Sequence, residues 1–282
     1  MPRDTTFAAD SFDDRCFAGL LAIVREAGEL TMRHFRSGAR VSGRVDWKEG
    51  GSPVTEVDFA VDRLLRERLS ALVPDAGWLS EETADTPDRL TKRTVWIVDP
   101  IDGTRAFMEG DPRFAVSVAL VVDGRPVSAV VDAPALRHVY AARVGQGAWL
   151  NDRSLRAPSD GSMAGAPIAG PKFLTEPVAQ KLGLAAQPKV PSLALRFAKV
   201  AAGDFSVSVA SADAHDWDIA GADLVLQEAG AQLLTIEGEP LNYNRVETKH
   251  GILIAAAEPF QSPVSAALRE VSEKWRKSKA RG

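Results

Sequence analysis

The sequence predicts a mixed α/β fold that contains antiparallel strands, and two observations carry this prediction. Strand-like and helix-like segments occur in both halves of the 282-residue chain. In addition, Asp123-Gly124 joins two β-rich segments, 114–122 and 125–131, as a hairpin turn does. Strands joined by hairpins pair antiparallel, so a purely parallel sheet is not expected.

Two amphipathic helices should precede these strands. From 13 to 34, apolar residues recur at steps of three and four, as on the buried face of a helix. The second helix should lie within 54–74, with Thr55 as its N-cap and Pro74 at its end. The glycine-rich segment 48–53 between them is predicted to be a mobile loop. Further strands of this half are expected at 77–82, 94–100, 138–144 and 147–152.

The composition changes after Ser154, where a passage rich in Ala, Gly, Pro and Ser begins. This change predicts a domain boundary that separates residues 1–154 from 155–282. In the second part shorter strands alternate with helices. Helices are expected at 175–182, 192–202, 216–229 and 262–275, and strands at 205–210 and 232–236.

The overall composition excludes several classes of protein. The formal net charge is -4, with acids and bases interspersed, which argues against a partner that is a nucleic-acid polymer. No stretch reaches the roughly 18 apolar residues that cross a bilayer, and the first residues are too polar for a secretory signal. The single cysteine, Cys16, cannot form an internal disulfide. We therefore expect a cytoplasmic protein.

The stretch WIVDPIDGTRAF places Asp99 and Asp102 directly after a run with the pattern of a buried strand. The carboxyl end of such a strand is a common ligand position in α/β proteins. If a short helix follows, the backbone N–H groups of Gly103 and Thr104 lie at its N-terminus, where phosphate binds. Acids beside a phosphate imply an intervening cation, and oxygen ligands favour Mg2+. The alternative is that Asp-Pro and Asp-Gly only form turns.

Three further acids could join this pair, although each has an ordinary structural explanation. Glu81 ends another strand-like run and could lie in a solvated loop. Asp58 follows Thr55 in a T-x-x-D pattern that caps helices. Asp218 falls in the first turn of a helix, where the helix dipole favours acids. Composition alone does not show whether these positions meet in space.

Four motifs occur in order along the chain: SPVTEVD, LSEE, WIVDPIDGTRAF and DWDIAGADLVLQEAG. This ordered set resembles the signature of the inositol monophosphatase superfamily, the lithium-sensitive, Mg2+-dependent phosphatases. The resemblance covers nearly the whole chain. It implies a layered αβαβα sandwich, with a large antiparallel sheet in the N-terminal half and a smaller sheet in the C-terminal half. The active site is then expected between the halves.

The resemblance also implies a role for each motif residue. The side chains of Glu81, Asp99, Asp102 and Asp218 and the backbone carbonyl of Ile101 would hold two or three Mg2+ ions. Asp102, Gly103 and Thr104 would hold the phosphate, Gly103 and Thr104 through their backbone amides. Asp58 would orient a water on the metal with help from Thr104, and Glu81 and Thr104 are candidates for guiding that water and accepting its proton.

The substrate is less well defined by the resemblance. Inositol monophosphatases carry a glutamate about seven residues before the aspartate matched by Asp218, whereas this chain has Ser211 there. The segment PSLALRF, which contains Ser192, resembles a substrate-contacting helix start of the 3'(2'),5'-bisphosphate nucleotidase branch, and DGTRAFMEGDP resembles the histidinol-phosphate phosphatase branch. Candidate substrate contacts are Ser192, Asp213 and His215.

Two further residues, Arg105 and Lys172, could bind a second phosphate, although solvated surface charge is the favoured explanation of both. The expected partner is a small phosphate ester, and a homodimer is expected from the family. The competing interpretation is a phosphatase-like binding protein without activity. Oxygen donors at every expected ligand position argue against that interpretation.

Overall fold

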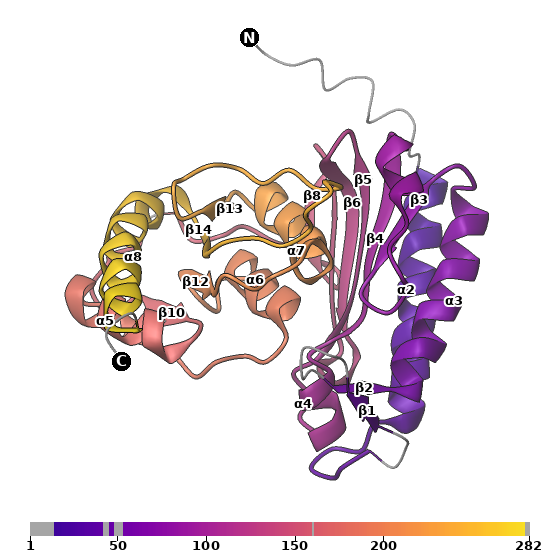
Figure 1. Ribbon diagram of the computed structural model, residues 1–282, viewed down its shortest axis with the longest axis horizontal. Coiled ribbons are helices and arrows are strands. Elements are labelled where there is room, and N and C mark those ends of the chain that lie inside the picture. Colours follow the sequence, from indigo (N-terminus) through magenta and orange to yellow (C-terminus); the bar gives the residue numbers. More distant parts are fainter. Residues whose placement is uncertain (1–13, 42–44, 48–52, 160, 280–282) are drawn as a thin grey trace.

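The computed structural model describes residues 14–41, 45–47, 53–159 and 161–279. Its helices and sheets form five layers, α, β, α, β and α, which follow one another from right to left in Figure 1. This arrangement confirms the predicted layered sandwich. The predicted mobile loop at 48–53 lies almost entirely outside the described residues; Pro53, at its end, begins strand β2.

The first layer is a pair of helices, α2 (Asp14–His34) and α3 (Glu56–Leu72). One apolar face of each helix, which includes Leu20, Val24 and Leu65, is fully buried against one face of the large sheet. Helix α3 begins as predicted, because the Thr55 side chain accepts bonds from the backbone of Val57 and Asp58 while Asp58 bonds back to Thr55. A short pair, β1 (Val45–Trp47) and β2 (Pro53–Thr55), precedes α3.

The large sheet has seven strands in sequential order. They are β3 (Gly77–Ser80), β4 (Thr94–Asp102), β5 (Ala115–Val122), β6 (Arg125–Ala133), β7 (His138–Arg143), β8 (Gly147–Leu150) and β9 (Arg153–Ser154). Six lie at the predicted positions, and the two-residue strand β9 was not predicted. Only β3 and β4 pair parallel; the other neighbours pair antiparallel. The sheet is therefore largely antiparallel, as expected.

Helices α6 (Leu193–Ala201) and α7 (Asp216–Glu228) form the middle layer between the two sheets. Small residues let α7 lie very close to the large sheet. A Cβ atom added at Gly221 would lie 2.8 Å from Ser117 Oγ on β5 and 3.2 Å from a methyl group of Val131 on β6. Glycine is therefore required here by close approach rather than by backbone conformation.

The small sheet has the strand order β11 (Ala185–Ala186), β10 (Pro167–Ala169), β12 (Val207–Ala210), β14 (Leu253–Ala256) and β13 (Gln232–Thr235). Helices α5 (Lys172–Leu182) and α8 (Glu258–Lys279) cover its outer face. Helix α8 starts four residues earlier than predicted and continues through Pro263, which lies in its second turn and leaves one i→i−4 hydrogen bond unmade. Strands β10, β11 and β14 were not predicted.

A single apolar cluster joins the two halves of the chain. It contains Val95 and Val131 from the large sheet together with Leu195 on α6, Leu224 on α7 and Leu253 on β14. The large sheet ends at Ser154, where the sequence predicts the boundary. Because the halves share a core, the division into domains 1–154 and 155–282 stays a prediction. No helix in the described ranges is both long and apolar enough for a membrane span.

Candidate active site

Strand β4 delivers two of the predicted acids to one place. Asp99 and Asp102 lie at its carboxyl end, where the pairing with β5 becomes irregular between these two residues. The parallel register of β3 places Ser80 beside Val98, and the Glu81 N–H donates to the Val98 carbonyl at 3.2 Å. Glu81 therefore leaves β3 next to Asp99, as expected for two parallel strands that end at the same sheet edge.

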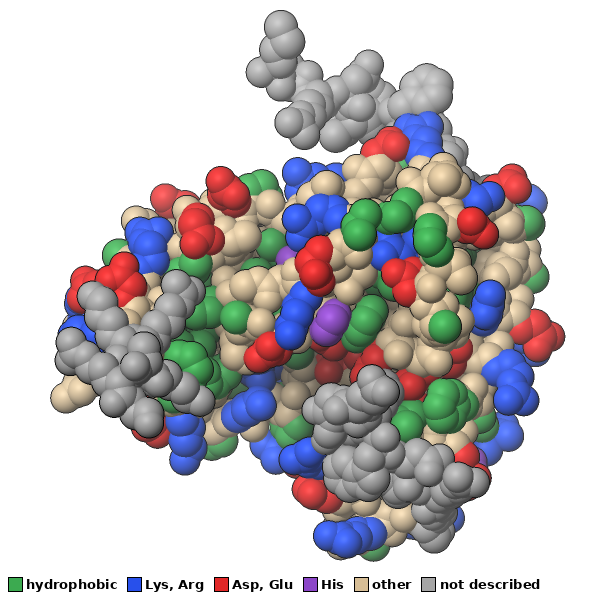
Figure 2. Space-filling view, in the orientation of Figure 1, with side chains coloured by type: hydrophobic (Ala, Val, Ile, Leu, Met, Phe, Trp, Pro, Cys, Tyr) green, Lys and Arg blue, Asp and Glu red, His purple; other side chains and the backbone are tan. Residues whose placement is uncertain are grey.

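The acidic cluster is completed from the other half of the chain. Carboxylate oxygens of Asp99, Asp102 and Asp218 all lie within 4.8 Å of one another. Asp218 is in the first turn of α7, and its Oδ2 accepts a 2.6 Å bond from the His215 backbone N–H. Its predicted position in the first turn of a helix is thus confirmed, but the same side chain also reaches β4. Figure 2 shows acidic side chains in the hollow at the centre of this face.

The surroundings of Asp99 are those of a carboxylate that binds a metal ion. Asp99 is 1% exposed; Oδ1 accepts a bond from the Ile101 N–H at 3.1 Å, and buried Oδ2 has no hydrogen-bond partner among the described residues. Burial, followed by the negative charges of Glu81, Asp102, Asp218 and Glu82, raises the pKa of Asp99 well above its ordinary value. A divalent cation would satisfy the free oxygen and neutralise this repulsion, so the residues fit such an ion.

Asp102 is held from the second half of the chain. Its Oδ2 accepts bonds of 2.6 Å from the Ser192 hydroxyl and 2.6 Å from the Ala194 N–H, at the start of α6. Burial raises the pKa of Asp102 to about 6, although these bonds oppose the shift. Ser192 itself is fully buried and caps α6 by accepting from the Leu195 N–H at 3.0 Å. The structure therefore places Ser192 behind Asp102.

Asp58 and Thr104 lie together, as the water-orienting role requires. The Thr104 hydroxyl is 3.1 Å from Asp58 Oδ1 and 3.0 Å from the Ile101 carbonyl, and its one proton can be donated to either at a time. Asp58 is fully buried, and burial raises its pKa, against the effect of its bonds from Thr55 and Thr104. The Ile101 carbonyl keeps a second lone pair with which it could bind a cation.

Gly103 lies between Asp102 and Thr104 and has a backbone conformation that favours glycine. Its φ is +92°, in the left-handed region that favours glycine, and it caps helix α4 (Thr104–Glu109). A Cβ atom added here would lie 3.2 Å from the Ser192 backbone nitrogen. Glycine thus lets α6 approach the turn closely. A short helix does follow the turn, which is the condition for N–H groups of Gly103 and Thr104 to lie at a helix N-terminus.

The predicted substrate contacts lie in different surroundings. The His215 ring stacks on Trp217, with centroids 4.5 Å apart, and Nδ1 is 3.1 Å from the Thr248 hydroxyl. Asp213 is exposed and forms an ion pair of 2.9 Å with Lys249. Arg105 and Lys172 are exposed. None of these contacts tests a role toward substrate, so that role stays a prediction.

Several supporting residues were not found by sequence reasoning. Asp62, one turn after Asp58 on α3, accepts bonds from the Ser80 and Thr83 hydroxyls at 2.5 and 2.6 Å, on either side of Glu81. The four-residue spacing from Asp58 was the available signal. Arg196, 3% exposed on α6, donates to the Val190 and Val209 carbonyls and the Ser208 hydroxyl. Burial lowers its pKa to about 10, opposed by the charge of Asp102.

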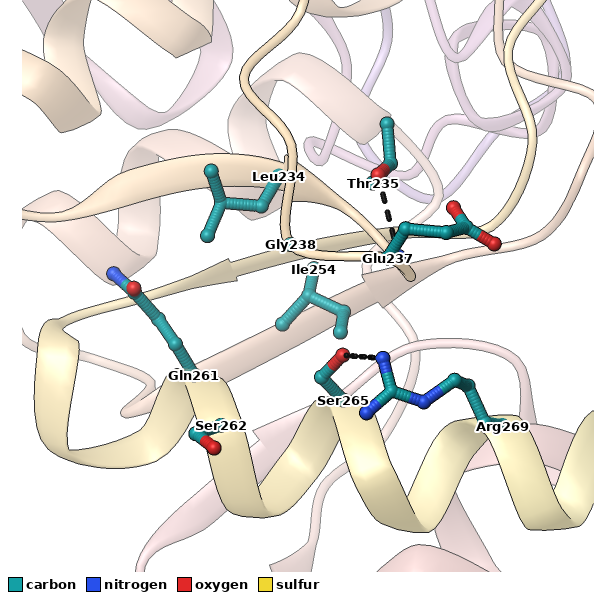
Figure 3. Close-up of a pocket in the computed structure, with 9 residues that line it drawn as sticks. All are labelled: Leu234, Thr235, Glu237, Gly238, Ile254, Gln261, Ser262, Ser265 and Arg269. Carbon is teal, nitrogen blue, oxygen red and sulfur yellow. Dashed lines mark hydrogen bonds between the residues drawn. The ribbon is translucent and has the colours of Figure 1, made fainter.

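A second pocket lies away from these acids, between the β13–β14 pair and α8 (Figure 3). Arg269 and Ser265 line it, and both donate to the Ile236 carbonyl. None of the predicted site residues lines this pocket. The acidic cluster is therefore the candidate active site.

Comparison with known protein families identifies the family to which the chain belongs. The model of the inositol monophosphatase family matches residues 13–273. The chain belongs to the inositol monophosphatase family. The members of this family are phosphatases, which hydrolyse phosphate monoesters. The resemblance seen in the four sequence motifs is therefore confirmed.

Relatives of this family member carry different substrate names. The chain is 35% identical over 87% of its length to an inositol-1-monophosphatase of Rhizobium meliloti, covering 96% of that protein. It is 31% identical over 81% of its length to a 3'(2'),5'-bisphosphate nucleotidase CysQ of Aggregatibacter actinomycetemcomitans, covering 87% of it. A histidinol-phosphatase of Chlorobaculum parvum is 40% identical, but over only 46% of this chain and 49% of that protein.

Solved structures of inositol monophosphatases have the same fold as this chain. The IMPase of Thermotoga maritima superposes with a TM-score of 0.78 at 27% identity, over 90% of this chain and 96% of that one. The extragenic suppressor protein suhB of Bartonella henselae gives 0.77 at 26% identity, over 90% and 98%. The αβαβα arrangement is thus that of the family.

Proposed function

We propose that this protein is a Mg2+-dependent phosphate monoesterase that hydrolyses a small soluble phosphate ester by attack of an activated water. The single observation that carries the proposal is the buried Asp99 Oδ2, which has no partner among the described residues within a cluster of three carboxylates. Five oxygen donors would hold two or three Mg2+ ions: the side chains of Glu81, Asp99, Asp102 and Asp218 and the carbonyl of Ile101. Family membership supports this assignment.

Bound at these donors, Mg2+ supplies charge neutralisation for the phosphate and lowers the pKa of a water. The side chains of the protein would do the rest. Asp58 and Thr104, 3.1 Å apart, would orient the attacking water, and Glu81 and Thr104 are the candidates for guiding it and accepting its proton. Asp102 and the backbone amides of Gly103 and Thr104 would position the phosphate. No covalent nucleophile is needed.

The reaction and its metal can be tested directly. Release of inorganic phosphate from small phosphate esters should occur in Mg2+ and be abolished by a chelator. Full activity in chelator would overturn the metal assignment. If no ester in a panel is hydrolysed although the divalent ion binds, the protein is instead a binding protein that retains the phosphatase fold.

The identity of the ester can be decided by competition among three candidates. These are inositol 1-phosphate, 3'-phosphoadenosine 5'-phosphate and histidinol phosphate, one for each kind of named relative. Ser211 stands where a ring-binding glutamate is expected, and this favours a substrate other than inositol phosphate. A tenfold preference in kcat/KM corresponds to about 1.4 kcal/mol of differential transition-state binding and would name the substrate class.

Three further proposals follow from the family resemblance. Lithium should inhibit the enzyme, which a titration of Li+ against Mg2+ would test. The protein should form a homodimer, which light scattering would test. It should act in the cytoplasm, which cell fractionation would test. A monomer in solution would remove the second proposal and leave the reaction untouched.

A further inference from the structure

We propose that Arg89, Asn244 and Asp216 form a hydrogen-bond network that positions Asp218 for the divalent cation. All three are positioning residues, because they act through the start of α7 rather than on the ion. The inference rests on the proposed metal site and deepens it. These residues hold Asp218, from the second half of the chain, next to the acids of the first half.

The need for such residues follows from where the cluster comes from. Asp99 and Asp102 belong to one strand, and the parallel neighbour β3 leads into Glu81. Asp218 comes from α7 in the other half, yet its carboxylate lies within 4.8 Å of both β4 acids. Apolar packing of the middle of α7 sets the depth of this helix but does not by itself fix its first turn, where helices are least constrained.

Asp216 fixes that first turn. It is fully buried two residues before Asp218, and its carboxylate accepts a 3.0 Å bond from the Asn244 N–H and a 2.7 Å bond from His250 Nε2. Its own backbone N–H donates to the Thr248 carbonyl at 2.9 Å. Three hydrogen bonds therefore join the start of α7 to the segment that connects β13 and β14. In Figure 1 this segment arches over α7 toward the large sheet.

Arg89 ties this segment to the half that carries Glu81. Arg89 is 2% exposed, and its guanidinium donates to both carboxylate oxygens of Asp85 at 2.6 and 2.7 Å. Asp85 follows Glu81 by four residues. Its Nη1 donates to Asn244 Oδ1 at 2.8 Å and to the Arg245 carbonyl at 3.0 Å. Asn244 Nδ2 donates back to the Arg89 carbonyl at 3.1 Å. The bonds run without a break from Asp85 through Arg89 and Asn244 to Asp216.

The same segment is attached to the large sheet at a second place, which supplies an internal control. Arg125 on β6 donates to the Leu241 carbonyl, and the Tyr243 N–H donates to the Gly124 carbonyl at 3.0 Å. Loss of the Arg125 bond leaves Asn244 and Asp216 untouched. If both attachments served only folding, loss of either would have the same effect on metal binding. If the network positions Asp218, only loss of the Arg89–Asn244–Asp216 bonds should weaken metal binding.

The test uses Asn244→Gly, Arg89→Met and the control Arg125→Met in the full-length protein. Glycine is chosen because Asn244 has a φ of +56°, which glycine adopts without strain, and because its N–H can still bond Asp216. Binding of Mn2+, used as the probe ion, is titrated by electron paramagnetic resonance, and melting temperatures are measured in chelator.

We expect the Mn2+ dissociation constant to rise about tenfold in Asn244→Gly and in Arg89→Met, at the low end of what loss of a supporting residue costs a metal site. It should stay within twofold of wild type in Arg125→Met, even where the melting temperature falls as far. If the control weakens Mn2+ binding as much as the two network variants, or if neither network variant weakens it, the inference is wrong. A wild-type protein that binds no Mn2+ would overturn the proposed function and this inference with it.

Discussion

Replacement of Asp99 by asparagine should raise the stability of the metal-free protein while it removes activity. Asparagine keeps the Oδ1 acceptor that Ile101 uses and nearly the same volume, but it removes one negative charge from a buried cluster. The amide is neutral and can donate to a neighbouring carboxylate, whereas a buried carboxylate oxygen without a partner, next to other negative charges, costs at least about 1–3 kcal/mol. In chelator at pH 8 the free energy of unfolding of Asp99→Asn should therefore exceed that of wild type by about this amount.

Mg2+ should stabilise wild type much more than Asp99→Asn. At a concentration one hundred times its dissociation constant, a bound ion adds about 2.7 kcal/mol to the free energy of unfolding. Wild type should gain this stabilisation, and Asp99→Asn should lose most of it. Turnover should fall by several orders of magnitude, and a thousandfold loss corresponds to about 4 kcal/mol of transition-state stabilisation.

Urea unfolding in chelator and in Mg2+, together with kcat, measures all three quantities. The matched control is Asp123→Asn, which also removes one carboxylate. Asp123 is exposed at the tip of the β5–β6 hairpin, where Asn-Gly is an equally good turn. An Asp99→Asn enzyme with wild-type turnover, or one that Mg2+ stabilises as much as wild type, would refute the assignment of Asp99 to the metal.

Three other substitutions test the surroundings of the site and the sheet. Burial raises the pKa of Asp132 to about 7 from 3.8, with Arg25 opposing and Glu29 adding to the shift, and Arg33 and Arg137 line the same pocket. The folded state holds this proton more tightly, so stability falls as pH rises from about 4 to 7; relative to wild type, Asp132→Asn should gain up to about 4 kcal/mol over that range in urea titrations, and a constant difference would contradict this. Asp62→Asn should raise the Mg2+ concentration for half-maximal rate about tenfold, because Ser80 and Thr83 donate to different oxygens of Asp62 and the amide replaces one of these two acceptors with a donor; an unchanged Mg2+ titration would exclude the role. Gly103→Ala should lower the free energy of unfolding by about 1–2 kcal/mol because of its φ of +92°, and wild-type stability in urea would show that the turn is not strained.

Local sequence signals predicted most of the fold and the centre of the site. The T-x-x-D pattern predicted both the start of α3 and the position of Asp58, since a capping box is built from residues three apart. The Asp-Gly hairpin fixed the antiparallel pairing of β5 and β6. The motif around Asp99 and Asp102 predicted a strand that ends in a turn, and both are present; the short helix on which the phosphate argument depended follows them.

Contacts between distant segments could not be predicted in the same way. Arg89 and Asn244 are 155 residues apart and lie in segments without a period, so no local pattern connects them. Ser192 was predicted as a substrate contact from its position before α6, but only the tertiary structure shows that its hydroxyl is bonded to Asp102. Strands of two to four residues in the small sheet, such as β10 and β11, are specified by their neighbours rather than by their own sequence.

The close approach of α7 to the large sheet at Gly221 has a consequence for which substitutions this protein can accept. A methyl group there would displace the helix or Ser117, and Asp218 lies one turn away on the same helix. Oxygen ligands bind Mg2+ at 2.0–2.1 Å with little tolerance, so a displacement that a hydrophobic core could absorb would still exceed what coordination allows. Substitution of Gly221 should therefore abolish activity while the protein still folds. Selection for catalysis can then act on Gly221, although this residue contacts only protein.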